Sequence, residues 1–364
     1  MAPDLLKFCM KRIALLNLAI DDNYGGNLQR YALVRVLQNM GYDVTHLLIM
    51  RKWTLWRIKT PIAIIKRLIE RFILGKTKSI FIEREYNKRY MANYNRISSF
   101  YERYIKHTAP IYSFSSLKKN KDFDIYIVGS DQVWRERMVR PFPMKAFFLS
   151  FVPRQKKIIA YAVSLGTSDK EFDYRQRSCL KKYYERFQCV SVREISARNI
   201  LLDYGWENPK AEWLVDPTFL LRKDDYIELV NSAETSQMDG KMFCYILDST
   251  KEKMDYIAQV AEKKNLKPFV TGLHEISIEQ WLRNFVDAEY IVTDSYHGFV
   301  FSMIFNKPVK LFFNDVRGNA RFESLFSLLN LSIDQEMYDW VQINEILSVE
   351  RQKAFNWLRN TLEN

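Results

Sequence analysis

The residues best suited to chemistry lie in one short polar turn, Thr293-Asp294-Ser295-Tyr296-His297-Gly298. The turn follows the apolar run Tyr290–Val292 and precedes an apolar helical pattern and a second strand-like run, Val309–Phe313. This order predicts a strand, a polar turn, a buried helix and another strand. In open α/β sheets, ligands collect beyond the carboxyl ends of strands, where helix N-termini present free N–H groups. The turn holds an acid, hydroxyl groups and one of only four histidines, so it predicts a site for a small anion.

Each polar residue of this turn has a chemical and a structural interpretation. Histidine is the usual side chain for giving and taking protons near neutral pH, so His297 suits proton transfer, or it is a structural histidine held by Asp294. Asp294 orients His297, acts as the base for a hydroxyl, or caps the following helix. Ser295 bonds a phosphate or supplies that cap. Gly298 allows close approach of the backbone to a ligand, or only tight packing.

A second polar turn follows the first predicted strand, Arg12–Ala19, and opens onto a predicted helix, Leu28–Met40. Its two glycines allow an anion or a sugar to rest against backbone N–H groups, and its amides are typical partners of sugar hydroxyls. The turn lacks the dinucleotide fingerprint, so it does not predict NAD. The alternative is an ordinary strand-to-helix connection. The candidate sugar-binding residues are Asn23, Gly25, Gly26, Asn27 and Gln29.

Two further strand ends carry candidate residues. Ser130, Asp131, Gln132 and Trp134 follow the predicted strand Phe123–Val128 and join polar groups to a flat aromatic face, which suits a pyranose. Asp131 is a candidate general base there, and the alternative is a buried tryptophan beside a capping aspartate.

The other of these two strand ends carries a cation. Arg193 follows the predicted strand Gln188–Val192, and its planar guanidinium matches a carboxylate or phosphate. The alternative is an ion pair with Glu194 or another nearby acid. The Asp216-Pro217 pair reads as a rigid structural turn without chemistry.

The alternation of strands and helices predicts an α/β protein. A chain of 364 residues is long enough for two cores. Two successive parallel-sheet units give two doubly wound, Rossmann-like domains that face each other across a cleft, the default binding place. The expected divisions are an N-terminal domain at 1–222 with a basic helical insertion at 51–107, a C-terminal domain at 223–337, and a helical tail at 338–364. The polar stretch Lys223–Gly240 is the expected linker.

Taken together, the polar turns resemble, in the same order, those of the polysaccharide pyruvyl transferase family. The matching pieces lie at Asn23–Leu33, Val128–Trp134, Ser191–Glu194, Asp216–Thr218, Thr293–Gly298 and Arg317–Arg321. The resemblance implies the two-domain glycosyltransferase fold called GT-B. It also implies a reaction in which phosphoenolpyruvate gives its enolpyruvyl carbons to two hydroxyls of one sugar. The products are a cyclic pyruvate ketal and inorganic phosphate, and this reaction requires no cofactor and no metal.

The resemblance also assigns roles. An arginine in the segment like Ser191–Glu194 helps to hold the donor in studied members, and a histidine in the turn like Thr293–Gly298 contacts it and assists proton transfer. Some members carry a second arginine where this chain has Ser295, so the donor-binding cation comes from elsewhere or the donor differs. The predicted catalytic residues are His297, Asp294 and Asp131. The predicted donor-binding residues are Arg193, Ser295, Tyr296, Gly298, Arg317 and Arg321; the sugar-binding residues, including Ser130, Gln132 and Trp134, take the acceptor side. A nucleotide-sugar glycosyltransferase and a non-catalytic sugar-binding relative are the other candidate functions.

Charge points to an anionic partner, because the net charge is +12. We recognise no nucleic-acid module, so no nucleic-acid partner is expected. Residues 51–84 contain ten Lys and Arg against Glu70 and Glu83, with an apolar helical face typical of interfacial membrane helices. The alternative is a core-packed helix with a solvated basic face. The expected partners are phosphoenolpyruvate, a lipid-linked sugar acceptor and an anionic membrane surface.

The sequence shows no signal-peptide pattern at Met1–Arg12 and no apolar run of the roughly 20 residues that a spanning helix needs. We therefore expect a cytoplasmic protein that works at the inner face of the cell membrane.

Overall fold

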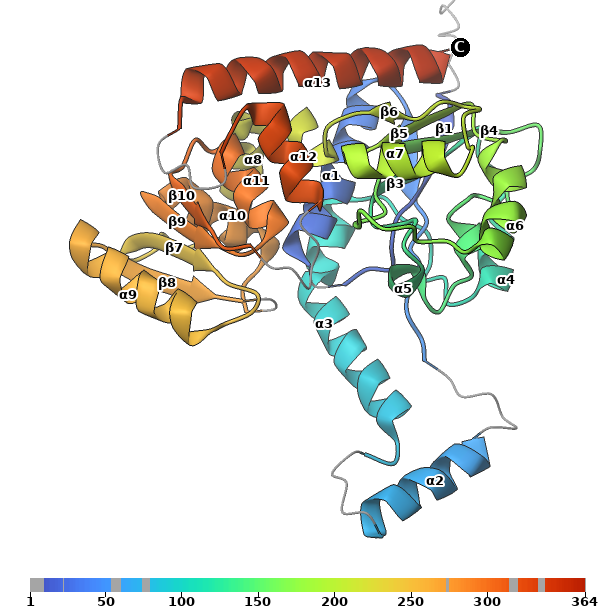
Figure 1. The fold of residues 1–364 in the computed structure, drawn as a ribbon, viewed down its shortest axis with the longest axis horizontal. Coiled ribbons are helices and arrows are strands. Elements are labelled where there is room, and N and C mark those ends of the chain that lie inside the picture. Colours follow the sequence, from blue (N-terminus) through green and yellow to red (C-terminus); the bar gives the residue numbers. More distant parts are fainter. Residues whose placement is uncertain are drawn as a thin grey trace, which may run out of the picture.

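The computed structural model describes residues 10–21, 23–53, 60–73, 79–272, 275–313, 320–332 and 338–363. These residues form two lobes, each built on one parallel sheet covered by helices (Figure 1). Arg317 and parts of the basic segment, residues 54–59 and 74–78, lie outside the described residues.

The first sheet has the order β2-β1-β3-β4-β5-β6, and every pairing is parallel. Its strands are β1 (Arg12–Leu16), β2 (Asp43–His46), β3 (Ile125–Asp131), β4 (Lys157–Val163), β5 (Cys189–Val192) and β6 (Glu212–Trp213). The central strands are buried along almost their whole length, as expected when helices cover both faces of a parallel sheet.

The second sheet has the order β10-β9-β7-β8 and is also parallel throughout. Its strands are β7 (Lys241–Tyr245), β8 (Lys267–Thr271), β9 (Tyr290–Thr293) and β10 (Val309–Leu311). The chain reverses its winding direction between β1 and β3 in the first sheet, and between β7 and β9 in the second. Ligands bind at such switch points. The predicted pair of doubly wound sheets is confirmed.

Thirteen α-helices and two 3-10 helices are formed by the described residues. They are α1 (Tyr24–Asn39), α2 (Thr60–Phe72), α3 (Ile82–Tyr104), α4 (Phe114–Leu117), α5 (Glu136–Val139), α6 (Tyr174–Tyr184), α7 (Ile195–Asp203), α8 (Lys223–Asn231), α9 (Lys251–Lys264), α10 (Ile278–Asp287), α11 (Tyr296–Ile304), α12 (Ala320–Leu329), α13 (Trp340–Glu363), and the 3-10 helices Met144–Ala146 and Pro217–Leu220.

Two segments differ from the sequence-based expectation. Helix α1 begins at Tyr24 rather than Leu28, because the Asn23 side chain accepts a hydrogen bond from the Gly26 N–H and caps the helix. Gly25 and Gly26 therefore lie in the first helical turn. The expected linker is also partly helical: α8 buries Tyr226 and Leu229 and packs against α10.

The two lobes share apolar packing behind the switch points. Tyr24 of α1 stacks on Trp281 of α10 with ring centroids 5.3 Å apart, and its hydroxyl donates to the Ile276 carbonyl. Helix α13 then returns from the second lobe to the first, where Arg351 Nε donates to the Phe219 carbonyl and Trp357 packs beside Tyr161 (Figure 1). These contacts hold the carboxyl ends of both sheets in one place.

Candidate active site

A cavity of about 200 Å³ lies where the carboxyl ends of the two sheets meet. Its wall comes from the segments that follow β1, β3, β7 and β9 and from α5, α11 and α12. The lining residues are Asn23, Asp131, Gln132, Arg137, Met138, Leu247, Asp294, Ser295, Tyr296, His297, Arg321 and Phe322. The fold thus gathers predicted residues from both lobes, and it does so at both winding reversals.

His297 lies in the first turn of α11, where the Ser295 hydroxyl caps the helix by accepting from the Gly298 N–H at 3.3 Å. Its imidazole packs directly over Gly25 of α1, so closely that a Cβ at Gly25 would overlap the ring. A glycine is therefore required on the first lobe to admit the histidine from the second. The Nε2 atom is buried and has no hydrogen-bond partner within the part of the chain that the structure describes.

The carboxylate nearest to that nitrogen belongs to Asp216, which the sequence analysis assigned to a structural turn. Asp216 Oδ2 lies 3.8 Å from His297 Nε2 and 2.6 Å from Arg193 Nη1. The other carboxylate oxygen, Oδ1, caps the 3-10 helix by accepting from the Thr218 N–H. Burial by itself would raise the pKa of Asp216, but the charge of Arg193 and the nearby His297 hold this pKa far below its usual range. Asp216 is thus an anion between the arginine and the histidine.

Asp216 was missed for an identifiable reason. It follows β6 at the carboxyl edge of the first sheet, where Asp131 and Arg193 also lie. The strand-end rule that selected those two residues applies equally to Asp216. Because Pro217 follows it, Asp216 was interpreted as part of a rigid turn. A proline at the start of a helix, however, leaves the side chain of the preceding residue available for contacts.

Arg193 is fully buried behind the cavity wall. Its Nη2 lies 3.2 Å from Asp131 Oδ1, and its guanidinium is 3.9 Å from Glu194 at the closest approach. Burial disfavours a charged guanidinium, yet the surrounding carboxylates, above all Asp216, raise the pKa of Arg193. The pairing with nearby acids, including Glu194, was the structural alternative in the sequence analysis. Here these pairs fix a permanent cation behind the cavity.

Asp131 is the acid that reaches the cavity from the first lobe. Its backbone has φ of +73°, a left-handed conformation that non-glycine residues seldom adopt and that is typical of constrained functional positions. Burial would raise the pKa of Asp131, but the charges of Arg193, Arg321 and His297 lower it. The side chain is therefore ionised at neutral pH and can accept a proton.

Two arginines lie against the ring of Tyr296. The guanidinium carbon of Arg193 is 5.0 Å from the ring centroid, and that of Arg321 is 5.2 Å away. Arg321 lines the cavity, and burial together with repulsion from Arg193 lowers its pKa. A third arginine, Arg137 of α5, lines the cavity from the first lobe and was not predicted. Its position depends on a short helix after β3 that the sequence pattern did not reveal.

Several predicted acceptor-binding residues do not line the cavity, because their side chains are buried in other interactions. Trp134 is fully buried, stacks on Phe148 at 4.7 Å and donates from Nε1 to the Phe147 carbonyl. Asn27 is also buried, and its Oδ1 accepts from Arg30 and Tyr101. These residues support the lobe rather than a sugar.

Gln29 and Ser130 do not line the cavity either, since both side chains are buried. Gln29 Nε2 donates to Ser130 Oγ at 3.1 Å and also to Asp216 Oδ2. The two side chains form a buried polar chain that holds the Asp216 carboxylate in place. Gln132 and Asn23 do line the cavity, and Gly25 and Gly26 lie behind it in α1.

Two assignments in the second lobe also change. Asp294 neither caps α11 nor holds His297: it accepts from the Leu247 and Asp248 N–H groups and pairs with Lys253 Nζ at 2.6 Å. It therefore ties together the ends of β7 and β9. Gly298 packs against the Thr293 side chain, where a Cβ would overlap Oγ1, so its small size serves packing and not the donor.

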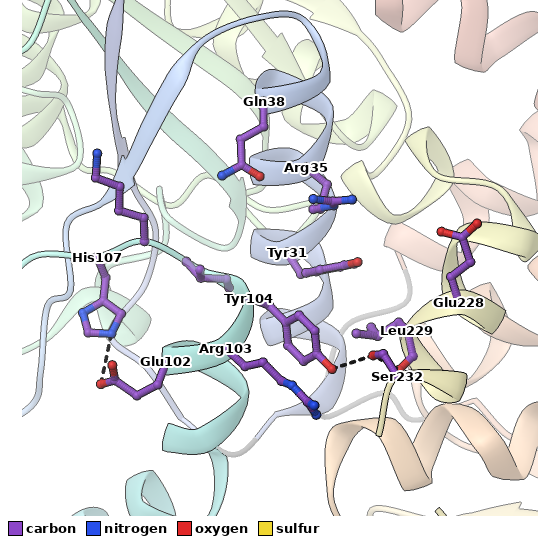
Figure 2. Close-up of a pocket in the computed structure, with 12 residues that line it drawn as sticks. Tyr31, Arg35, Gln38, Glu102, Arg103, Tyr104, His107, Glu228, Leu229 and Ser232 are labelled. Atoms are coloured by element: carbon purple, nitrogen blue, oxygen red, sulfur yellow. Dashed lines mark hydrogen bonds and ion pairs between the residues drawn. The ribbon is translucent and has the colours of Figure 1, made fainter. Parts of the chain in front are cut away.

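A larger cavity of about 740 Å³ lies away from this chemistry, between α1, the end of α3 and α8 (Figure 2). In it, Glu102 Oε1 lies 3.4 Å from His107 Nε2, and the Tyr104 and Ser232 hydroxyl oxygens lie 2.7 Å apart. None of the predicted site residues that the structure describes lines it. The smaller cavity, with its converging charges, is the better candidate.

Two searches of the described residues are negative. They contain no group of three or more His, Cys, Asp or Glu side chains placed to hold a metal ion. In the same part of the chain, no helix has the length and apolar character needed to cross a membrane.

Comparisons with known proteins agree with the fold and extend it. The family model described as polysaccharide pyruvyl transferase matches residues 23–311. The structure of UDP-GlcNAc 2-epimerase from Neisseria meningitidis superposes with a TM-score of 0.52 over 98% of this chain and 100% of that one, at 11% identity. The enzyme of the same name from Rickettsia bellii gives 0.49 over 96% of each chain, at 9% identity. At such identity the first match shows the fold alone, and it confirms the predicted GT-B architecture.

A curated relative matches only locally. Glutamate–tRNA ligase of Prochlorococcus marinus (strain MIT 9515) is 26% identical over 115 residues, which cover 28% of this chain and 24% of that protein. The chain thus spans about a quarter of the length of the curated relative it matches.

Proposed function

This chain belongs to the polysaccharide pyruvyl transferase family, and from that premise we propose that it transfers pyruvate from phosphoenolpyruvate to two hydroxyls of one sugar in a surface-polysaccharide precursor. The product is a pyruvate ketal. Family membership supports transfer of pyruvate to a polysaccharide; the donor, the ketal and the residue roles are our proposal.

One observation supports this proposal above the others: a histidine from the second lobe and an ionised aspartate from the first line the same small cavity, with arginines on two sides. Phosphoenolpyruvate is small and carries roughly three negative charges near neutral pH. Arg321 and Arg137 offer guanidinium groups for its phosphate and carboxylate. Ser295 and the N-terminal N–H groups of α11 add donors at the same end of the helix.

The proposed donor contacts differ from the predicted ones in one respect. Arg193 lies behind the wall and is already bonded to Asp131 and Asp216. We assign it the role of holding both carboxylates ionised, rather than that of a direct ligand. Some family members have a donor-binding arginine where this chain has Ser295, and we assign the role of that arginine to Arg321.

In the proposed reaction, His297 donates a proton to the methylene carbon of the donor, which becomes the methyl group. A sugar hydroxyl attacks the neighbouring carbon and gives its proton to Asp131. The bond from that carbon to the phosphate oxygen breaks, and the second hydroxyl closes the ring. As the ring closes, the second hydroxyl gives its proton to the His297 imidazole and restores the acid. Asp131 passes the first hydroxyl proton to the departing phosphate, so the atoms balance. Asp216 stabilises the protonated imidazole, as a carboxylate behind a catalytic histidine does.

The acceptor side of the cavity contains Asn23 and Gln132, whose amides suit sugar hydroxyls. Asp131 lines the same cavity, and we assign it the role of the general base that the hydroxyl needs. This arrangement replaces the stacking interaction that the sequence analysis expected from Trp134.

The test is a turnover assay with purified protein, phosphoenolpyruvate and a lipid-linked sugar. We expect release of inorganic phosphate with the mass gain of one pyruvate ketal on the sugar, and loss of both with His297→Asn, which keeps a polar side chain over Gly25. Turnover only with a nucleotide sugar, or binding without turnover for a full panel of acceptors, would refute the proposal.

A further inference from the structure

The basic insertion presents its apolar side to solvent. Five large apolar side chains on and just after α2 are uncovered, with exposed fractions between 46% and 76%: Ile62, Ile65, Ile69, Phe72 and Ile73. At 3.6 residues per turn they fall within about 100° of one another around the helix. We define these five residues as the α2 apolar face.

The helix is attached to the protein through its polar side. Arg67 donates two hydrogen bonds to Glu83 of α3, at 2.6 and 2.8 Å, and a third to the Ile80 carbonyl. On the helix, Arg67 lies roughly opposite the α2 apolar face. A surface helix normally turns its apolar side to the core. Here the orientation is reversed, so the apolar face is left for another partner.

Helix α3 projects this face beyond the active-site edge of the first lobe. The Tyr90 hydroxyl of α3 donates to the Ile20 carbonyl, in the loop after β1. From Tyr90 back to Ile82 the helix extends by about 12 Å, with α2 at its far end (Figure 1). Asn87 bonds both backbone groups of Trp53, which fixes the base of this projection.

The positive charge of this segment favours an anionic lipid surface over a second copy of the chain as the partner of the α2 apolar face. Residues 51–84 contain ten Lys and Arg against two acids. Two copies paired through this segment would bring like charges together, which opposes self-association. An anionic lipid surface attracts the same charges and accepts the apolar side chains at its headgroup boundary.

We propose that α2 docks this protein on an anionic membrane surface, with the α2 apolar face inserted and the net positive charge of residues 51–84 attracted to the headgroups. The projection leaves from the edge of the lobe that contains the cavity, so docking brings the active site close to the lipid. That docking serves to reach a sugar carried on a lipid rests on the proposed function, whereas the docking itself does not.

The experiment is flotation with vesicles of phosphatidylcholine alone or with phosphatidylglycerol added. We expect recovery of the wild-type chain only with the anionic vesicles, falling with added salt. Ile65→Glu/Phe72→Glu should reduce the bound fraction by about tenfold or more, because two buried charges oppose insertion. The matched control is Val341→Glu/Val349→Glu, on the equally exposed side of α13, which should float as the wild type does.

Equal recovery of the wild type and the α2 variant would overturn the proposal. A stable wild-type dimer in sedimentation velocity that becomes monomeric only in the α2 variant would also overturn it, because a second copy would then cover the α2 apolar face. Both α2 substitutions are at exposed positions, and a thermal unfolding curve matching that of the wild type shows that the fold is retained. Flotation needs no turnover. If the wild-type chain does not float but turns over a soluble sugar, the docking proposal is refuted. If it floats normally but has no activity, the proposed pyruvate transfer is refuted.

Discussion

The contact between Gly25 and His297 gives the sharpest prediction. A Cβ at Gly25 would overlap the imidazole ring, whereas a Cβ at Gly26 has no neighbour closer than 3.8 Å. Both glycines lie in the first turn of α1, so the gain in helix propensity from alanine, up to about 1 kcal/mol, is similar for both variants. The difference between Gly25→Ala and Gly26→Ala therefore isolates the collision.

Overpacking at a close-packed position costs about 1 to 3 kcal/mol. Because the overlap involves ring atoms between two packed helices, we expect Gly25→Ala to be less stable than Gly26→Ala by about 3 kcal/mol. If the histidine moves instead, a displacement near 1 Å should lower kcat by about a hundredfold. Gly26→Ala should keep both properties near those of the wild type.

The assay is chemical unfolding of both variants, followed by turnover with phosphoenolpyruvate. Adding His297→Ala to Gly25→Ala should recover most of the lost stability, because the two changes remove the same collision. Equal stability and equal activity for the two alanine variants would show that His297 does not pack on α1, and the active-site geometry described above would be wrong.

Three further predictions concern buried groups. Asp216→Asn keeps the cap on the 3-10 helix but removes the charge beside Arg193, so the free energy of unfolding in denaturant should fall by about 3 kcal/mol. A fall below about 1 kcal/mol would mean that Asp216 is only part of a structural turn. The free energy of unfolding should fall as the pH drops below about 4. Asp131 and Asp216 have lowered pKa values in the folded chain, so the unfolded chain takes up protons first. Asp131→Asn should therefore show a smaller fall in melting temperature between about pH 6 and pH 3 than the wild type, and an unchanged fall would contradict this. Trp134→Phe loses the bond to the Phe147 carbonyl and core volume, so it should destabilise the chain by about 2 kcal/mol without changing the KM for the sugar; a raised KM at wild-type stability would mean that the ring does contact the acceptor.

The strand ends were largely predictable because the pattern of apolar runs is local. Period and length separate buried strands from helices, and the residue after a strand must lie at the carboxyl edge of its sheet. His297, Asp131 and Arg321, which the sequence singled out, line one cavity, and their chemical roles stay proposals. The start of α1 was less predictable, because Asn23 caps the helix ahead of two glycines that looked like a loop.

The partners of each polar side chain were not predictable in the same way. Trp134 and Asn23 each follow a strand in the sequence, yet the first is in the core and the second lines the cavity. Their local patterns are similar, and only the neighbours contributed by distant segments distinguish them. The same holds for Asp294, whose three donors come from the β7–α9 region.

The amino-acid order alone was enough to specify two parallel sheets, their polar edges and the family to which the chain belongs, since these depend on short-range periodicity and on motifs in series. Only the packed molecule could decide that Asp216 lies between Arg193 and His297, and that α2 turns its apolar side outward. Both facts arise from contacts between segments far apart in the chain. Electrostatic interaction and burial depend on distance in space, which the spacing of residues along a sequence does not fix.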